Sequence, residues 1–133
     1  MNVQPYLFFE GRCDEALEFY RRAAGAEVTE LVRYRDNPDG TCKPGTEDKV
    51  MHCSFRIGDT TIWASDGLCA GQTKFHGFSL AITVSTADEA ERLFAALSDG
   101  GQVQVPLAET FYSPLFGMLI DRFGMLWMVV VGK

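Results

Sequence analysis

Two histidines and one glutamate are the side chains of this chain best suited to acid–base or metal chemistry. His52 lies on the more polar side of a segment that alternates in polarity, so it either points into a pocket or is a structural or solvated residue. His76 lies in a linker and is expected at the surface. Glu109 precedes an aromatic pair and is either a buried carboxylate with a shifted pKa or an exposed glutamate at a strand end. Since the sequence has no Ser-His-Asp set, activated-nucleophile motif or phosphate loop, His52 and Glu109 are the weak catalytic candidates.

The cysteines and the turn aspartates are assigned structural roles. The four cysteines form no C-x-x-C pair, which favours four reduced thiols over a zinc or dithiol site. Cys53 is expected in the core from its strand position, and Cys42 falls in a predicted loop. Asp66 and Asp121 stand beside glycines, where stabilisation of a turn explains both.

Aromatic residues are the other group of side chains that could bind a ligand. A Tyr or Trp side chain offers apolar area and one hydrogen-bonding tip, which suits a planar or amphipathic ligand. The aromatic residues at or near the predicted pocket strands are Trp63, Phe111, Tyr112, Phe116 and Trp127. Plain core packing is the alternative interpretation of this group.

Composition and charge exclude several classes of function. The net charge is -6 and the pI is about 4.8, and Arg21-Arg22 is the only adjacent basic pair, so nucleic acid and anionic membranes are not expected partners. No apolar run has the roughly 20 residues of a membrane span, and residues 1–10 lack the features of a signal peptide. We therefore expect a cytoplasmic protein.

Alternation and helical spacing predict the elements that position these residues. The predicted strands cover residues 3–9, 28–34, 50–57, 60–65, 78–84, 103–105 and 125–131, with a hairpin around Ser113-Pro114. The predicted helices begin near Asp14 and near Thr86 or Asp88, and end at Gly25 and at Gly100-Gly101. The segment 36–47 is a long loop that is either a lid or simply mobile.

The two halves of the chain repeat one order of elements. Asp14-Glu15-Ala16 matches Asp88-Glu89-Ala90 at an offset of 88 − 14 = 74 residues, and the first strand of each half then coincides. The sequence therefore predicts an α+β fold of two βαβββ modules, residues 1–68 and 75–133, in a single domain. We expect a curved mixed sheet with the helices on its convex side and a ligand pocket on its concave side.

This layout resembles the vicinal oxygen chelate superfamily, which includes glyoxalase I, bleomycin-resistance proteins and extradiol dioxygenases, and most closely its PhnB-like branch. The matching fragments occur in order along nearly the whole chain. They are Pro5-Tyr6, Glu15-Ala16, Phe19-Tyr20, Gly25-Ala26, Ser65-Asp66, Gly77-Phe78-Ser79-Leu80, Glu109-Thr110-Phe111, Phe116-Gly117, Asp121-Arg122-Phe123-Gly124 and Trp127-Met128.

The resemblance implies where a metal ion would be held. Metal enzymes of the superfamily take His, Glu or Gln ligands from the first and last strand of each module. Carried onto this chain, those positions are Pro5, Trp63, Ser79 and Met128, which are poor ligands for a hard divalent cation. We therefore expect no metal and no other cofactor.

The sequence thus favours a metal-free protein that binds a small organic molecule, and the resemblance implies a homodimer. The expected pocket residues are Trp63, Ser79, Phe111, Tyr112 and Met128. The alternative is a superfamily enzyme, of the isomerase, lyase or dioxygenase type, with an atypical or absent metal site. A third possibility is an oligomer whose pocket is vestigial.

Overall fold

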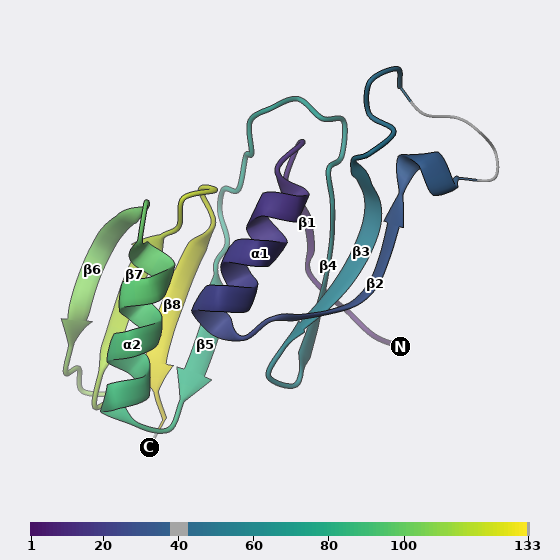
Figure 1. Cartoon of the computed structure of the whole chain (residues 1–133). Helices are drawn as coiled ribbons and strands as arrows, with labels where there is room; N and C mark the ends of the chain where they lie inside the picture. The colour runs from purple at the N-terminus through teal and green to yellow at the C-terminus, as the bar shows by residue number, and fades with distance from the viewer. Residues whose placement is uncertain (38–42, 133) are drawn as a thin grey trace. The chain divides into compact units, whose positions relative to one another are not determined.

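The computed structural model describes residues 1–37 and 43–132 of the chain. These residues form two compact units, Met1–Thr73 and Lys74–Lys133 (Figure 1). Within the described residues, each unit has the order strand, α-helix, strand, strand, strand. The predicted α+β class and the repeated βαβββ order are therefore confirmed.

Unit 1 is a four-stranded sheet with one face covered by a helix. Its elements are β1 (Tyr6–Phe8), α1 (Cys13–Ala24), β2 (Glu27–Arg33), a 3-10 turn (Tyr34–Asp36), β3 (Val50–Ile57) and β4 (Thr60–Ser65). The strand order is β1-β4-β3-β2, with β1 parallel to β4 and the other neighbours antiparallel. Strand β1 is shorter than predicted because it pairs only with Trp63–Ser65, and Pro5 before it has no N–H to donate.

Helix α1 buries one side against the sheet. Acidic residues occupy its first turn, and Gly25 ends it in the left-handed conformation with φ of 68°, as its C-cap position requires. The rings of Tyr20 and Phe55 stack with centroids 6.1 Å apart, and the Sγ atoms of Cys13 and Cys53 lie 3.7 Å apart. Cys53 is fully buried, as predicted. Contact with the Cys53 thiol and burial raise the pKa of Cys13, so this thiol stays protonated at neutral pH.

Unit 2 repeats the arrangement with a different edge strand. Its elements are β5 (Leu80–Val84), α2 (Ala87–Ser98), β6 (Gln102–Ala108), β7 (Phe116–Ile120) and β8 (Leu126–Val131), in the order β5-β8-β7-β6. Thr86 caps α2 by accepting a hydrogen bond from the Glu89 N–H. Strand β6 is longer than the predicted 103–105, because an edge strand tolerates Pro106 and continues past it.

Each unit also contains a buried aspartate that holds loops to strands. Asp66 accepts hydrogen bonds from the N–H groups of Gly11, Cys13 and Val50 at 2.7–2.9 Å. Asp121 accepts bonds from two backbone N–H groups and, at 2.8 Å, from the indole N–H of Trp127. Asp121 therefore stabilises its own turn, as predicted. Asp66 is also structural, but its carboxylate bonds N–H groups 16 to 55 residues away rather than those of its own turn, which corrects the prediction.

Two further sequence predictions concern the loop 36–47 and the absence of a membrane-spanning segment. Residues 38–42 of the predicted loop 36–47, including Cys42, lie outside the described residues, so the lid remains a prediction. None of the helices in the described parts of the chain is long and apolar enough to cross a membrane.

Candidate functional site

The candidate site lies on the side of the unit 1 sheet opposite α1, which we call the helix-free face. Cys53 and Phe55 face α1, so the alternating residues His52 and Ser54 of β3 face the other way. Ser54 pairs in register with Trp63 of β4, which pairs with Tyr6 of β1. One row of side chains therefore runs across three neighbouring strands on the helix-free face.

Four rings form a cluster there, defined as the aromatic cluster: Tyr6, Phe8, His52 and Trp63. The centroid of Tyr6 lies 5.0 Å from that of Phe8, 5.6 Å from that of His52 and 6.3 Å from that of Trp63. The centroids of His52 and Trp63 are 5.8 Å apart. Tyr6 and Trp63 are each 37% exposed and Phe8 is 50% exposed, whereas the rings on the α1 side are buried. The cluster therefore presents aromatic surface that unit 1 does not use for its core.

The polar tip of the cluster is a hydrogen bond between the Tyr6 hydroxyl and His52 Nδ1, 2.9 Å apart. Which of the two donates depends on the tautomer of His52. Partial burial raises the pKa of Tyr6, and a side-chain hydrogen bond with Ser65 opposes the rise. The phenol is therefore neutral at neutral pH and can donate or accept one further hydrogen bond at the rim of the rings.

The residues of the helix-free face do not fit a divalent metal ion. Among residues 1–37 and 43–132, no group of three or more His, Cys, Asp or Glu side chains is placed to hold one. His52 Nδ1 is already bonded to Tyr6, and its neighbours in the cluster are rings rather than oxygen or nitrogen ligands. At the mapped position Pro5, the carbonyl oxygen accepts a hydrogen bond from the Trp63 backbone N–H. We derive no catalytic step through a metal.

The predicted site residues divide between the two units. Unit 1 brings His52 and Trp63 together in the aromatic cluster. In unit 2, Met128 is half-buried on β8 and pairs in register with Ala81, two residues after the half-buried Ser79.

The loop between β6 and β7 carries the remaining candidates. Phe111 is 94% exposed, and its ring packs edge-on against Tyr112 with centroids 5.0 Å apart. Glu109 is exposed just after the end of β6, which matches the second of its two predicted alternatives. Trp127, one of the aromatic residues predicted at or near the pocket strands, is 1% exposed and belongs to the core of unit 2.

Sequence reasoning missed two members of the cluster, Tyr6 and Phe8. Both lie in an apolar run with Leu7 and Phe9, which are buried. Because all four residues are apolar, the pattern predicts a strand but does not show which side faces the core. The usable signal was the i, i+2 spacing of Tyr6 and Phe8, which places both rings on one side of the strand.

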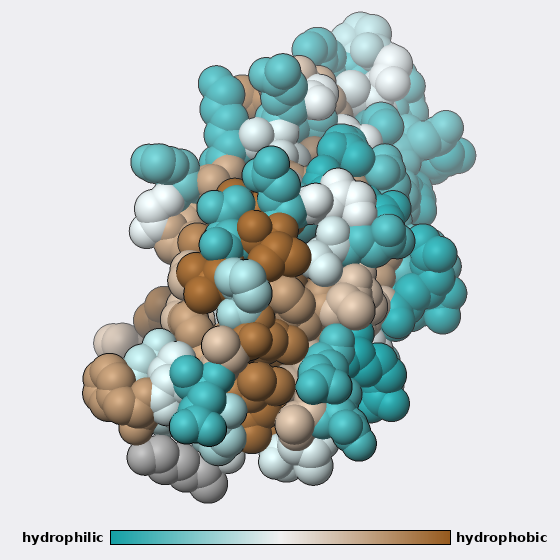
Figure 2. Space-filling model, turned by 90° about the vertical axis from the view of Figure 1, so that its left-hand side faces the viewer, coloured by the Kyte–Doolittle hydropathy of each residue, from teal (hydrophilic) through white to brown (hydrophobic). Residues whose placement is uncertain are grey.

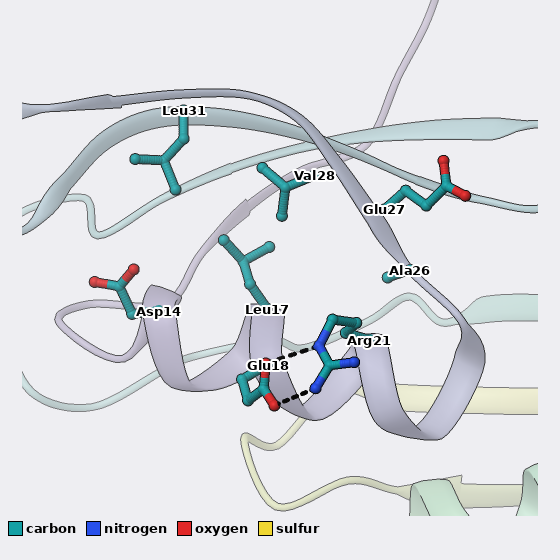
Figure 3. A pocket seen from close by; sticks show the side chains of 8 residues that line it. All are labelled: Asp14, Leu17, Glu18, Arg21, Ala26, Glu27, Val28 and Leu31. Atoms are coloured by element: carbon teal, nitrogen blue, oxygen red, sulfur yellow. Dashed lines mark hydrogen bonds and ion pairs between the residues drawn. The ribbon is translucent and has the colours of Figure 1, made fainter.

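A groove lies on the α1 side of unit 1, and its lining residues include no aromatic ring and no unpaired charge (Figure 3). It has a volume of about 630 Å³ and lies between α1 and the edge strand β2. Its lining residues are Asp14, Leu17, Glu18, Arg21, Ala26, Glu27, Val28 and Leu31. The three acidic residues are all engaged, with Arg33, Arg21 and Arg56 respectively. We assign the candidate site to the aromatic cluster because the groove holds neither a ring nor an unpaired charge.

Two βαβββ units in one chain are typical of a class of protein, the glyoxalase/bleomycin-resistance fold. A glyoxalase/bleomycin resistance protein/dioxygenase family enzyme from Burkholderia phytofirmans superposes with a TM-score of 0.61 at 16% identity, covering 98% of this chain and 96% of that one. At this identity the likeness concerns the fold alone.

Within that class, the chain belongs to the family whose model is described as 3-demethylubiquinone-9 3-methyltransferase, which matches residues 1–130. Protein PA1353 of Pseudomonas aeruginosa is 37% identical, with a TM-score of 0.87, over 99% of this chain and 98% of that one. A PhnB protein from Bacillus cereus is 28% identical, with a TM-score of 0.83, over 99% and 100% of the two chains. Protein YjdN of Escherichia coli K12 is 30% identical over 100% of this chain and 97% of its own length. The predicted PhnB-like membership is confirmed.

Proposed function

We propose that the chain is a metal-free PhnB-like protein that binds a small organic molecule on the aromatic cluster of unit 1. The observation that carries this proposal is the exposure of three aromatic rings on the helix-free face, with the Tyr6–His52 hydrogen bond at their rim. Exposed aromatic surface with one placed polar group is typical of a site that orients a planar or amphipathic ligand.

The metal-ligating atoms available in the cluster support the metal-free part of the proposal. A divalent ion needs several converging oxygen, nitrogen or thiolate ligands, whereas the cluster offers one imidazole already in a hydrogen bond. The predicted alternative was a superfamily enzyme with an atypical or absent metal site. Its metal-dependent form would need a group of ligands that the described residues do not bring together.

The methyltransferase wording of the family description receives no support from the residues around β1 and α1. In nucleotide-binding folds, a glycine-rich turn leaves the N–H groups at the helix start free for the ligand. Here the N–H groups of Gly11 and Cys13 both donate to the buried Asp66 carboxylate. We therefore do not extend methyl transfer to this chain.

We also propose that the protein is a cytoplasmic homodimer, and that strand β6 contributes to contact with a second copy. Strand β6 is an edge strand of unit 2, its segment 102–108 carries no charged residue, and Val103 and Val105 are exposed. Figure 2 looks onto this side of the molecule and shows hydrophobic side chains gathered between hydrophilic ones. Edge strands without charged residues invite pairing, here over the residues that precede Pro106, and a second copy presents the same strand. Light scattering should show a dimer that Val105→Lys weakens; a monomeric wild type would refute the proposal.

Native mass spectrometry of the whole protein against a metabolite library tests binding. We expect at least one bound small molecule with the wild type and loss of its adduct in Trp63→Ala, whereas Phe111→Ala, at an exposed ring of unit 2, should retain it. Elemental analysis after dialysis should show no stoichiometric Zn, Ni, Fe or Mn. A full metal equivalent, or an adduct that survives in Trp63→Ala, would overturn the proposal.

A further inference from the structure

We infer that the ligand of the aromatic cluster is an organic cation: a flat apolar body that carries an ammonium or similar positive group. This inference rests on the proposed binding function and adds the charge of the ligand. It follows from two carboxylates that flank the rings, from the partial charge of the ring faces, and from the pairing of Arg56 on the same face with Glu27.

The first carboxylate is Glu30 of the edge strand β2. Glu30 pairs in register with Ser54, and Ser54 pairs with Trp63, so Glu30 lies in the same row as the cluster. The next residue, Leu31, pairs with Cys53 and lines the groove on the α1 side, which places Glu30 on the helix-free face. Two strand spacings separate its backbone from that of Trp63, about 10 Å. Glu30 is exposed and makes no ion pair with any described residue.

The second carboxylate is Glu10, at the other end of the cluster just after β1. A Cβ placed on Gly67 would clash with Glu10 Oε2 and lie 3.2 Å from Cδ1 of the Phe8 ring. The carboxylate and the ring edge therefore lie side by side. Glu10 Oε1 accepts a hydrogen bond from the Ala70 N–H, and Glu10 adopts a left-handed conformation with φ of 52°. The loop thus fixes a negative charge beside Phe8 at some cost in backbone strain.

The guanidinium on this face is already paired with a carboxylate. Arg56, on the helix-free side of β3, pairs with Glu27 at 2.8 Å. Nδ1 of His52 is in a hydrogen bond with the Tyr6 hydroxyl. An anionic ligand would therefore meet two carboxylates and a guanidinium that is already paired, whereas a cationic ligand meets complementary charge.

The aromatic rings also favour a positively charged ligand. The faces of Tyr, Phe and Trp carry partial negative charge, so a cation above them is attracted electrostatically, most strongly by Trp. A ligand of about 10 Å can lay its apolar body against Trp63 and Tyr6 while its cationic group reaches Glu30. The row Tyr6–Trp63–Ser54–Glu30 thus fits an amphipathic amine better than a neutral or acidic molecule of the same shape.

Three indole compounds of matched shape test the inference: tryptamine, a cation; tryptophol, which is neutral; and indole-3-propionate, an anion. Each is titrated into the whole, isotope-labelled protein while the two indole N–H signals are followed by NMR. The Trp63 signal reports on the cluster, and the Trp127 signal, buried and bonded to Asp121, serves as the internal control. We expect tryptamine to bind about tenfold more tightly than tryptophol, with indole-3-propionate weaker still. Glu30→Gln should remove most of that preference, whereas Glu109→Gln, an exposed carboxylate of unit 2, should not.

The outcomes separate this inference from the proposed function. Equal affinity for tryptamine and tryptophol, or tighter binding of indole-3-propionate, would overturn the cationic ligand while leaving the aromatic cluster as a binding site. An unchanged preference in Glu30→Gln would also overturn it. If no indole compound moves the Trp63 signal, the inference fails, and the library experiment with Trp63→Ala decides separately whether the proposed function fails with it.

Discussion

The two tryptophans of the chain lie in the corresponding parallel strand pairs of the two units, displaced by one residue, and are used in opposite ways. Trp63 pairs in register with Tyr6 between β4 and β1, and Trp127 pairs with Leu80 between β8 and β5. Trp63 is 37% exposed on the helix-free face, whereas Trp127 is 1% exposed and its indole N–H donates to buried Asp121. One repeat therefore uses its tryptophan as surface, and the other uses it as core.

The difference comes from which residues of the parallel pair face the helix. In unit 1 the neighbouring pair Leu7 and Ala64 is buried, so Tyr6 and Trp63 point away from α1. In unit 2, Gly117 approaches Phe94 of α2, and its register partner Val129 lies two residues from Trp127. Trp127 therefore faces α2. Side chains alternate along a strand, so a displacement of one residue between repeats exchanges core for surface.

Truncating the two tryptophans gives the largest expected contrast. Trp127→Ala removes a fully buried ring and leaves the Asp121 carboxylate short of a donor, so it should lower the free energy of unfolding by about 3–5 kcal/mol. Trp63→Ala removes a part-exposed ring and should cost less than about 1 kcal/mol. Urea unfolding measures both values. Similar losses in the two variants would mean that the comparison is wrong and that Trp63 is also core.

The buried aspartates should give a smaller loss that is shared by both units. Asp66→Ala leaves the N–H groups of Gly11, Cys13 and Val50 without their acceptor, and a loss of about 2–3 kcal/mol is expected from unsatisfied buried donors. Asp121→Ala should behave alike, because its carboxylate also accepts three bonds. Glu109→Ala, at an exposed carboxylate, is the control and should change stability by less than about 0.5 kcal/mol. An Asp66→Ala variant as stable as this control would contradict the structural role of Asp66.

The smallest expected effect is a pH dependence from the cluster itself. Burial raises the pKa of Tyr6, so the unfolded chain releases this proton at a lower pH than the folded chain. The contribution of Tyr6 is fully present below its ordinary pKa of about 10 and is lost as pH rises through its raised folded value. Unfolding measurements across the alkaline range should show a stability that falls with pH less steeply in Tyr6→Phe than in the wild type. Equal slopes would mean that the Tyr6 phenol is as well solvated as in the unfolded chain.

The sequence predicted well those elements whose burial follows a simple period. The alternation in 50–57 and the glycine turn after it predicted β3 and β4 to the residue. Strand β6 was predicted too short because the alternation of 102–105 stops at Pro106, a residue that an edge strand tolerates but that usually marks the end of a strand. Of the aromatic cluster, His52 and Trp63 were singled out from strand position and resemblance. Tyr6, Phe8 and the flanking Glu10 and Glu30 were not, because the face of an all-apolar strand and the neighbours of an edge glutamate depend on tertiary register.

The central claim is that unit 1 binds a small molecule on its aromatic cluster and not in the groove between α1 and β2. Intermolecular NOEs from bound tryptophol, the neutral indole probe, test this claim directly because they do not depend on the charge of the ligand. The account predicts NOEs from the probe to the ring protons of Tyr6, Phe8 and Trp63. NOEs to the methyl groups of Leu17, Val28 and Leu31 in the groove would contradict it.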